Sequence, residues 1–229
     1  MSDVAPLEPA ESEDPRRSPP EWLLRLAERA ATRPVPALMR PPAGRGRRAA
    51  VLLLFGEGPF GPDILLIQRS MLGRRHAGQP AFPGGGVDPG DGGPIGAALR
   101  EAEEETGLDP SGVHVIGTMP ELYIRHSDNR VTPVLGWWHT PSAVHAASPR
   151  EVDAVERVPI AELADPANRL LLRHPSGHTG PAFRVRGLLV WGFTAGVLDS
   201  LLPLGGFERP WDRGRVEDLP PDAVQPRRA

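Results

Sequence analysis

The apolar positions of this chain fall into short blocks that alternate between helical and strand periodicity. Apolar residues at helical spacing predict a first helix over 20–31. Two continuous apolar runs bounded by glycine and proline predict a hairpin of buried strands, over 49–55 and 63–69. The last long block has helical periodicity and predicts a helix over 188–202. Further blocks predict strands over 113–119, 131–138, 151–158 and 182–186.

A second helix is predicted between two glycine-rich turns in the middle of the chain. Pro94 suits the first turn of this helix, and Gly107 suits its C-terminal stop. At about 100° per residue, one side of the helix forms the expected core face. The residues on that side are Ile95, Ala98, Leu99, Ala102 and Thr106.

Three glutamates share a neighbouring face of the same helix, namely Glu101, Glu104 and Glu105. Like charges at spacings of three and four residues destabilise an isolated helix by about a few tenths of a kcal/mol per pair. A solvated acidic face is the ordinary interpretation of such a run. The glycine turn before the helix and the half-buried face favour a site for a hard divalent cation, with the acids partly exposed.

Composition narrows the class of protein. The 229 residues suit one domain with extensions, and a domain of that size needs no disulfide or metal for its stability. Cysteine is absent and all the lysine and arginine positions are arginine, which excludes thiolate and lysine Schiff-base chemistry. The formal net charge of −3 leaves no strongly basic face for nucleic acid.

The ends of the chain differ from its middle. Residues 1–20 are rich in proline, glutamate, serine and alanine and are expected to be disordered. Residues 205–229 form a tail rich in proline and glycine, which leaves 21–204 as the expected folded domain. No apolar stretch approaches the roughly 20 residues of a membrane span, and the acidic N-terminus lacks the core of a signal peptide. We therefore expect a cytoplasmic protein that binds neither membranes nor nucleic acid.

A long spaced pattern surrounds the glutamate helix. From Gly86 the chain resembles the Nudix box, in which a glycine and a spacer precede Arg-Glu-aliphatic-any-Glu-Glu-any-Gly-aliphatic. The box has an acid where this chain has Gly92, and Asp91 stands one place earlier. The matching positions are Arg100, Glu101, Ala102, Glu104, Glu105, Gly107 and Leu108.

The resemblance implies both a fold and a reaction. Nudix hydrolases act on a nucleoside diphosphate linked to another group, and their fold is an α/β/α sandwich with a mixed β-sheet. The resemblance implies that Glu101, Glu104 and Glu105 hold Mg²⁺ or Mn²⁺ and that Arg100 orients these acids. The general base that takes the proton of the attacking water is either Glu101 or Glu151.

The segment just before the box, LLIQRSMLGRRHAGQPAFPGG (65–85), resembles the second signature of the coenzyme A pyrophosphatase branch of this family. Ile67 replaces a threonine of that signature. The matching positions are Leu65, Leu66, Arg69, Ser70, Arg74, Gly78, Phe82, Pro83, Gly84 and Gly85.

This second resemblance implies hydrolysis of coenzyme A or acyl-coenzyme A to 3′,5′-ADP and 4′-phosphopantetheine or its acyl form. Arginine binds phosphate through paired, charge-assisted hydrogen bonds. Arg69 and Arg74 are therefore the expected partners of the substrate phosphates, and Gly84, Gly85 and Gly86 complete the expected binding site.

Alternatives stay open at this point. A Nudix pyrophosphatase for ADP-ribose, NADH or a nucleoside triphosphate would carry the same helix, and an inactive nucleotide-binding module would share the fold. The intact set of glutamates disfavours the inactive module.

GRGRRA (44–49) has the spacing of a dinucleotide fingerprint, but it precedes a predicted strand instead of following one. His174 and His178 are expected in a loop. The sequence is compatible with Mg²⁺ or Mn²⁺, and with a monomer or a homodimer.

Overall fold

The computed structural model describes residues 18–72 and 77–224. Within these residues, no helix is both long enough and apolar enough to cross a lipid bilayer. The helices are α1 (Glu21–Ala31), α2 (Pro94–Thr106), α3 (Ile160–Ala164), α4 (Gly192–Leu204) and α5 (Pro221–Val224). The strands are β1 (Arg47–Gly58), β2 (Gly61–Arg69), β3 (Pro80–Ala81), β4 (Gly84–Gly86), β5 (Val113–Thr118), β6 (Leu122–Ile124), β7 (Asn129–Trp138), β8 (Val152–Pro159), β9 (Arg169–Arg173), β10 (Thr179–Val185), β11 (Leu188–Val190) and β12 (Val216–Asp218).

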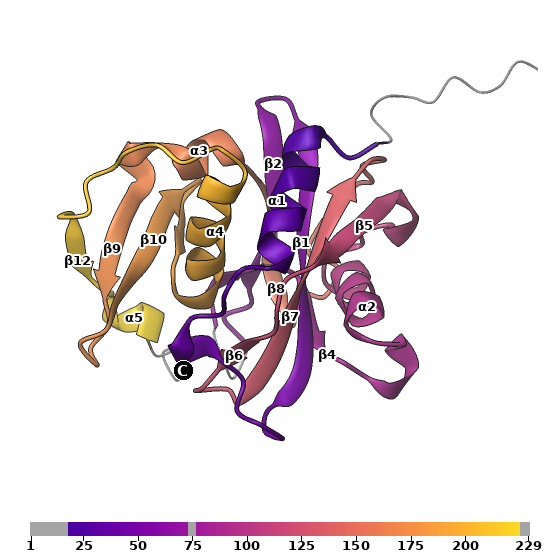
Figure 1. Ribbon diagram of the computed structural model, residues 1–229, viewed down its shortest axis with the longest axis horizontal. Coiled ribbons are helices and arrows are strands. Elements are labelled where there is room, and N and C mark those ends of the chain that lie inside the picture. Colours follow the sequence, from indigo (N-terminus) through magenta and orange to yellow (C-terminus); the bar gives the residue numbers. More distant parts are fainter. Residues whose placement is uncertain (1–17, 73–76, 225–229) are drawn as a thin grey trace, which may run out of the picture.

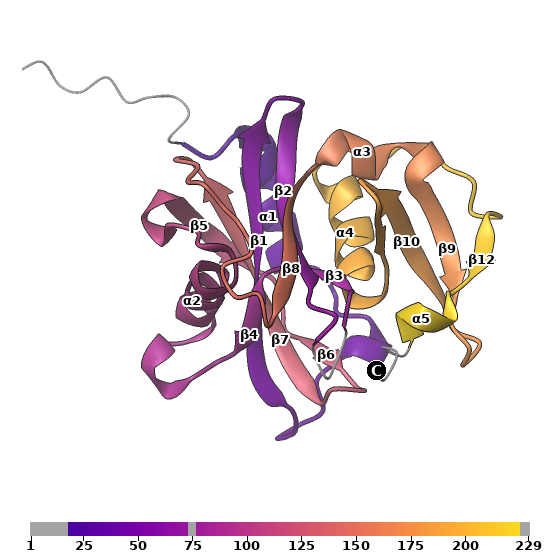
Figure 2. The ribbon, with the colours of Figure 1, turned by 180° about the vertical axis from the view of Figure 1, so that it is seen from behind.

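The larger of two sheets is mixed. Its strands run in the order β3-β2-β1-β7-β5, with β4 paired to β1, β6 to β7 and β8 to β2. The central pair β1 and β7 is parallel, and the other pairs of this sheet are antiparallel. Helix α2 lies on one side of the sheet and helices α1 and α4 lie on the other (Figures 1 and 2). This arrangement confirms the expected α/β sandwich with a mixed sheet.

Strand β1 is buried on both faces, which explains its continuous apolar run. Side chains alternate between the faces of a strand. Leu53 and Phe55 accordingly pack in the cluster that contains α1 and α4. Leu52 and Leu54 pack in the cluster that contains α2. A strand that is covered by helices on both faces carries apolar residues on both faces, so its sequence does not alternate between apolar and polar residues.

The predicted first helix and the strands of the larger sheet are confirmed, but the helix over 188–202 was wrong at its start. Residues 188–190 form strand β11, which pairs with β10, and helix α4 begins only at Gly192. Gly192 has a φ of 65°, a left-handed conformation that glycine adopts without steric cost and that interrupts a helix. The chain therefore turns between the strand and the helix.

The second sheet, in the order β11-β10-β9-β12, stands beside the larger one, and α4 packs against its strand β10 (Figure 1). Arg169 of β9 is 1% exposed and pairs with Asp199 of α4. Its guanidinium also stacks on the rings of Phe183 and Trp211, at 5.4 and 4.6 Å from their centroids. After residue 205, the chain adds β12 in parallel to β9, with Val216 opposite Leu171.

Candidate active site

Helix α2 is fixed to the sheet by small side chains. Ala97, Ala98 and Ala102 are fully buried against the larger sheet. Gly107 ends the helix in a left-handed conformation, with a φ of 66°, as predicted. The expected core position of Ile95 was wrong, because its side chain is 42% exposed. Gly96, the residue after Ile95, packs closely on Asp91 of the short 3₁₀ helix η2 (Pro89–Asp91).

The predicted substrate-binding glycines form strand β4, which pairs with β1 beside the acidic helix. A Cβ at Gly84 would lie 2.3 Å from the carbonyl oxygen of Ala50. A Cβ at Gly85 would lie 2.4 Å from the carboxylate of Glu101. Glycine at both positions therefore lets the backbone of β4 approach both β1 and a predicted metal ligand closely.

Glu105 is the most deeply buried acid of the site, with 2% of its side chain exposed. The expectation that this acid is partly exposed was wrong, because it turns from α2 toward β4. Its carboxylate accepts a hydrogen bond from the Gly84 N–H at 2.9 Å, and Arg69 Nη1 lies 3.7 Å from its Oε1. Burial raises the pKa of Glu105 to about 7. The Gly84 and Arg69 contacts lower that pKa, whereas Glu101 and Glu151 raise it further.

Arg100 connects the acids of the site. Its Nη2 lies 3.0 Å from Glu101 Oε1, and its Nη1 donates to Glu104 Oε2 at 3.1 Å. Nη2 also donates to the carbonyl oxygen of Gly86 at 3.1 Å. Arg100 therefore contacts the strand and two of the three predicted metal ligands, as an orienting role requires.

Asp91, the acid that stands one place before the position of the box occupied by Gly92, contacts Arg100, a contact that was not predicted. Its carboxylate accepts hydrogen bonds from Arg100 Nε at 2.7 Å and Nη2 at 3.2 Å. The bond to Arg100 lowers the pKa of Asp91, helped by a bond from the Asp88 N–H at 2.7 Å. A signal was present in the sequence at Gly96, inside the helix. A Cβ there would lie 1.9 Å from the Asp91 carbonyl oxygen, so this glycine marks where η2 contacts α2.

Glu101 and Glu151, the two candidates for the general base, differ in burial. The Glu101 side chain is 17% exposed, and burial raises its pKa. Glu104 and Glu151 raise the pKa of Glu101 further by repulsion, while Arg100 lowers it. Glu151 is exposed and precedes β8, and its carbonyl oxygen accepts a hydrogen bond from the Ser70 N–H at 2.8 Å. The charge of Glu151 raises the pKa of both Glu101 and Glu105.

The acids have the chemistry of a divalent-cation site, although they do not converge on one point. Among the described residues, no three acidic or histidine side chains are arranged to hold a metal ion. Arg100 and the Gly84 N–H hold the carboxylates instead. Carboxylate oxygens are nevertheless the ligands that Mg²⁺ and Mn²⁺ prefer, and the mutual repulsion is what a cation would relieve. The residues present therefore fit such an ion.

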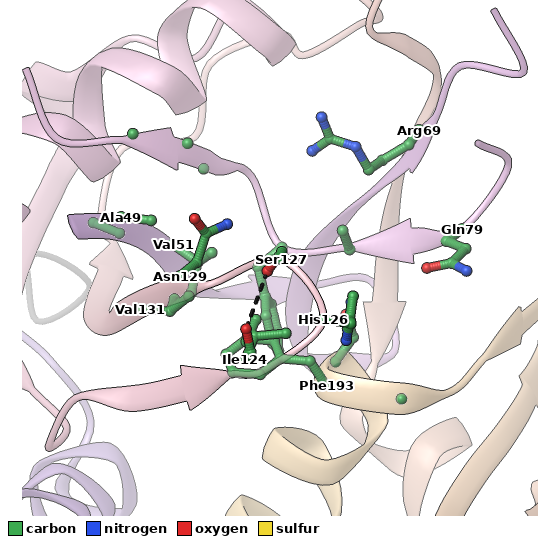
Figure 3. Close-up of a pocket in the computed structure, with 18 of the residues that line it drawn as sticks. Ala49, Val51, Arg69, Gln79, Ile124, His126, Ser127, Asn129, Val131 and Phe193 are labelled. Carbon is green, nitrogen blue, oxygen red and sulfur yellow. Dashed lines mark hydrogen bonds between the residues drawn. The ribbon is translucent and has the colours of Figure 1, made fainter. Parts of the chain in front are cut away.

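A cavity of about 380 Å³ opens beside β4 and contains the Gly84–Gly86 strand in its wall. Figure 3 shows Arg69 of β2, Asn129 and Val131 of β7, and Phe193 of α4 around it. Arg69 is thus placed at the pocket, whereas Arg74 lies outside the described residues. We call this cavity the site pocket.

Two further arginines of the site pocket were not predicted. Arg47 and Arg48 line it from the start of β1, and both are exposed. They belong to the GRGRRA segment, which resembles a nucleotide fingerprint only in its spacing. Pairing between β1 and β7 brings Arg47 opposite Asn129 and so places these arginines at the pocket. The sequence gives no sign of that pairing.

The chain is similar in sequence and in fold to proteins of one family. The model of the NUDIX domain family matches residues 44–179. The "Uncharacterized Nudix hydrolase NudL" of Escherichia coli (strain K12) is 42% identical over 175 residues, which cover 72% of this chain and 88% of that protein. The protein of the same name from Shigella boydii serotype 4 is similar to the same extent.

Among solved structures, a Nudix hydrolase from Nitrosomonas europaea covers 78% of this chain and 82% of its own, with a TM-score of 0.46 and 11% identity. A binary complex of the C. elegans Ap4A hydrolase covers 49% of this chain and 80% of its own, with a TM-score of 0.42 and 22% identity. The family model alone spans more than half of the chain. The chain therefore belongs to the Nudix hydrolase family, enzymes that hydrolyse nucleoside diphosphate derivatives and generally use divalent metal ions.

Proposed function

We propose that this Nudix hydrolase is a cytoplasmic enzyme that cleaves the diphosphate bond of coenzyme A or an acyl-coenzyme A. The products are 3′,5′-ADP and 4′-phosphopantetheine or its acyl form. The observation that carries the proposal is the site pocket, which Arg69, Arg47 and Arg48 line together with the glycine strand of the acidic site. The signature over 65–85, which contains Arg69 and the glycines of β4, supports the same substrate.

The arginines suit a substrate with a phosphate beyond its diphosphate. Arg69 lines the pocket from β2, and Arg47 and Arg48 line it from the start of β1. Guanidinium groups bind phosphate by bidentate, charge-assisted hydrogen bonds. Coenzyme A carries a 3′-phosphate in addition to its diphosphate, and these side chains offer it partners that the acidic residues cannot provide.

The predicted ligands of Mg²⁺ or Mn²⁺ are Glu101, Glu104 and Glu105. A bound divalent ion supplies Lewis-acid polarisation of the phosphoryl oxygens and lowers the pKa of water. Arg100 orients Glu101 and Glu104 through the contacts described above.

The chemical step is attack of water on a phosphorus atom of the diphosphate. The water oxygen bonds to phosphorus while the bridging phosphorus–oxygen bond breaks, and the leaving phosphate keeps the electron pair. Either Glu101 or Glu151 accepts the proton that the water loses. Burial raises the pKa of Glu101, which favours proton transfer near neutral pH. Glu151 has the advantage of exposure to the solvent from which water enters.

A turnover screen of the purified protein tests the proposal. Coenzyme A, dodecanoyl-coenzyme A, ADP-ribose, NADH and ATP are incubated with Mg²⁺ or Mn²⁺, and the products are separated by chromatography. We expect 3′,5′-ADP from both coenzyme A substrates, at a higher kcat/KM than for the other nucleotides. A higher kcat/KM for ADP-ribose, NADH or ATP would replace this substrate assignment, and the absence of all turnover would indicate a binding module.

A further inference from the structure

A second cavity adjoins the site pocket. Its volume is about 600 Å³, and it lies between the larger sheet and the second sheet. The two cavities share part of their walls, formed by Ile124, His126 and the Trp191–Phe193 segment at the start of α4. Figure 3 shows Ile124, His126 and Phe193 together on the side of the site pocket away from Arg69. The two cavities therefore meet along this shared wall.

Apolar side chains from both sheets and α4 form most of the lining of the second cavity. The contributors from the larger sheet are Met119 and Leu122, which follow β5 and begin β6. Helix α4 contributes Phe193 and Val197, and the second-sheet region contributes Leu172 and Leu219. A cavity of several hundred Å³ with such a lining has the size and character of a ligand site.

Many of the polar side chains around this cavity already have partners within the protein. Arg33 donates to the Ser200 carbonyl oxygen at 2.6 Å, and Asp199 pairs with the buried Arg169. Tyr123 donates to Asp128 at 2.6 Å. The His174 ring interacts with the Ser176 hydroxyl at 2.8 Å, in the turn between β9 and β10 that was predicted as a loop. The surface left for a ligand is therefore mainly hydrocarbon.

We propose that the second cavity binds the acyl chain of an acyl-coenzyme A, so that the preferred substrate is an acylated form. This inference rests on the proposed function, because the phosphates must occupy the site pocket. The pantetheine arm leaves the diphosphate on the side opposite the adenosine and carries the thioester at its end. An aliphatic chain on that thioester would pass the shared wall and lie in the second cavity. Moving the chain from water to the apolar lining is favourable in proportion to the apolar area that is buried.

Gly196 offers a direct test. Gly196 belongs to α4 and lines the second cavity. A Cβ at this position would have no atom within 4 Å, apart from the two neighbouring residues and the nearby backbone of its own helix. Gly196→Leu therefore adds a side chain into the cavity while it raises the helix propensity of α4. The matched control is Gly117→Leu in β5, where a Cβ also has open space and which lines neither cavity.

Binding is measured by calorimetry without divalent ions, with coenzyme A and dodecanoyl-coenzyme A as ligands. We expect the wild type to bind the dodecanoyl form at least about tenfold more tightly, the scale at which even a single methylene is discriminated in an apolar pocket. Gly196→Leu should abolish this preference, and Gly117→Leu should retain it. If Gly196→Leu does not fold, Gly180→Leu replaces it, because the nearest atom to its Cβ is the His178 ring tip at 3.7 Å.

Equal affinity of the wild type for both ligands would overturn the inference, as would a preference that survives in the folded cavity variant. A wild-type dimer that dissociates in Gly196→Leu would also overturn it, because a second copy would then be the occupant. Turnover with Mg²⁺ separates this inference from the proposed function. An acyl preference in binding with no hydrolysis of either ligand would remove the proposed function and retain the cavity assignment.

Discussion

At the scale of single residues, the geometry of the site depends on one guanidinium group. Arg100 contacts Glu101, Glu104 and Asp91, three acids that would otherwise repel one another. The Arg-Glu pairing could be predicted from the sequence because its members lie on one turn of helix. The Asp91 contact could not, because it depends on how η2 folds back onto α2.

The predicted metal ligands are tested by replacing one charge at a time. Glu104→Gln and Glu105→Gln should each lower kcat by orders of magnitude, because each removes a carboxylate that a divalent cation needs. Glu103→Gln is the matched control, since Glu103 is exposed on the same helix. The measurement is kcat with Mg²⁺, with thermal unfolding as a check of folding. Near-normal activity of either variant would contradict the ligand assignment.

Glu101 and Glu151 are separated by pH-rate profiles. A general base contributes about 10² to 10⁴ in rate. The glutamine variant of the true base should lose kcat by about that factor. It should recover part of the rate at high pH, where hydroxide replaces the activated water. The other variant should show no such recovery. If both variants keep the wild-type profile, another group accepts the proton.

The contact of Asp91 with Arg100 predicts a pH-dependent stability. Arg100 lowers the pKa of Asp91 in the folded protein. Asp91 therefore contributes stability above its unfolded pKa of about 3.9, and that contribution is lost as the pH falls through the lower folded pKa. Urea unfolding at several pH values should show Asp91→Asn less stable than wild type from pH 7 to 5, with the difference shrinking below pH 4. A difference that is constant down to pH 3 would show that Asp91 acts by packing alone.

At the scale of elements, the apolar pattern predicted the strands of six or more residues and missed the shorter ones. Strand β1 was predicted because both of its faces are covered by helices. Strand β4 has the sequence GGG and no side chains from which to infer periodicity, although it forms a wall of the site. Strand β12 is three residues long and mostly exposed, and its pairing with β9 comes from the far end of the chain. Such pairings are tertiary contacts, which local pattern does not encode.

Replacement of Gly84 or Gly85 of β4 by alanine should affect stability and activity to different extents. The new Cβ of Gly84→Ala meets backbone atoms of β1, which cannot move aside, so we expect a loss of about 1–3 kcal/mol in stability. The new Cβ of Gly85→Ala meets the mobile end of Glu101, so we expect a fall in kcat with a smaller loss of stability. Chemical denaturation and steady-state kinetics measure the two effects. Equal losses of stability would contradict this division of roles.

At the scale of the whole molecule, function depends on how the second sheet positions α4. The buried Arg169 of β9 pairs with Asp199 of α4, and the start of α4 lines both the site pocket and the second cavity. The sequence resemblance identified the acidic helix and the arginine signature, because both are local. It could not show Arg47 and Arg48 at the same pocket, since they lie on a different strand and reach it only through the pairing of β1 with β7.

The arginines that line the site pocket predict discrimination between coenzyme A and dephospho-coenzyme A. A charge-assisted hydrogen bond to the 3′-phosphate is worth roughly 1.5 to 3 kcal/mol. Dephospho-coenzyme A should therefore have a kcat/KM about tenfold to hundredfold lower than that of coenzyme A.

We compare both substrates with the wild type and with Arg47→Ala, Arg48→Ala, Arg69→Ala and Arg74→Ala. The variant that lacks the true partner should lose its preference, because only the phosphorylated substrate is affected. A variant that only disturbs the structure, as loss of the Arg69 contact with Glu105 would, should weaken both substrates equally. Wild-type protein that hydrolyses both substrates equally well would show that no arginine of the pocket binds the 3′-phosphate.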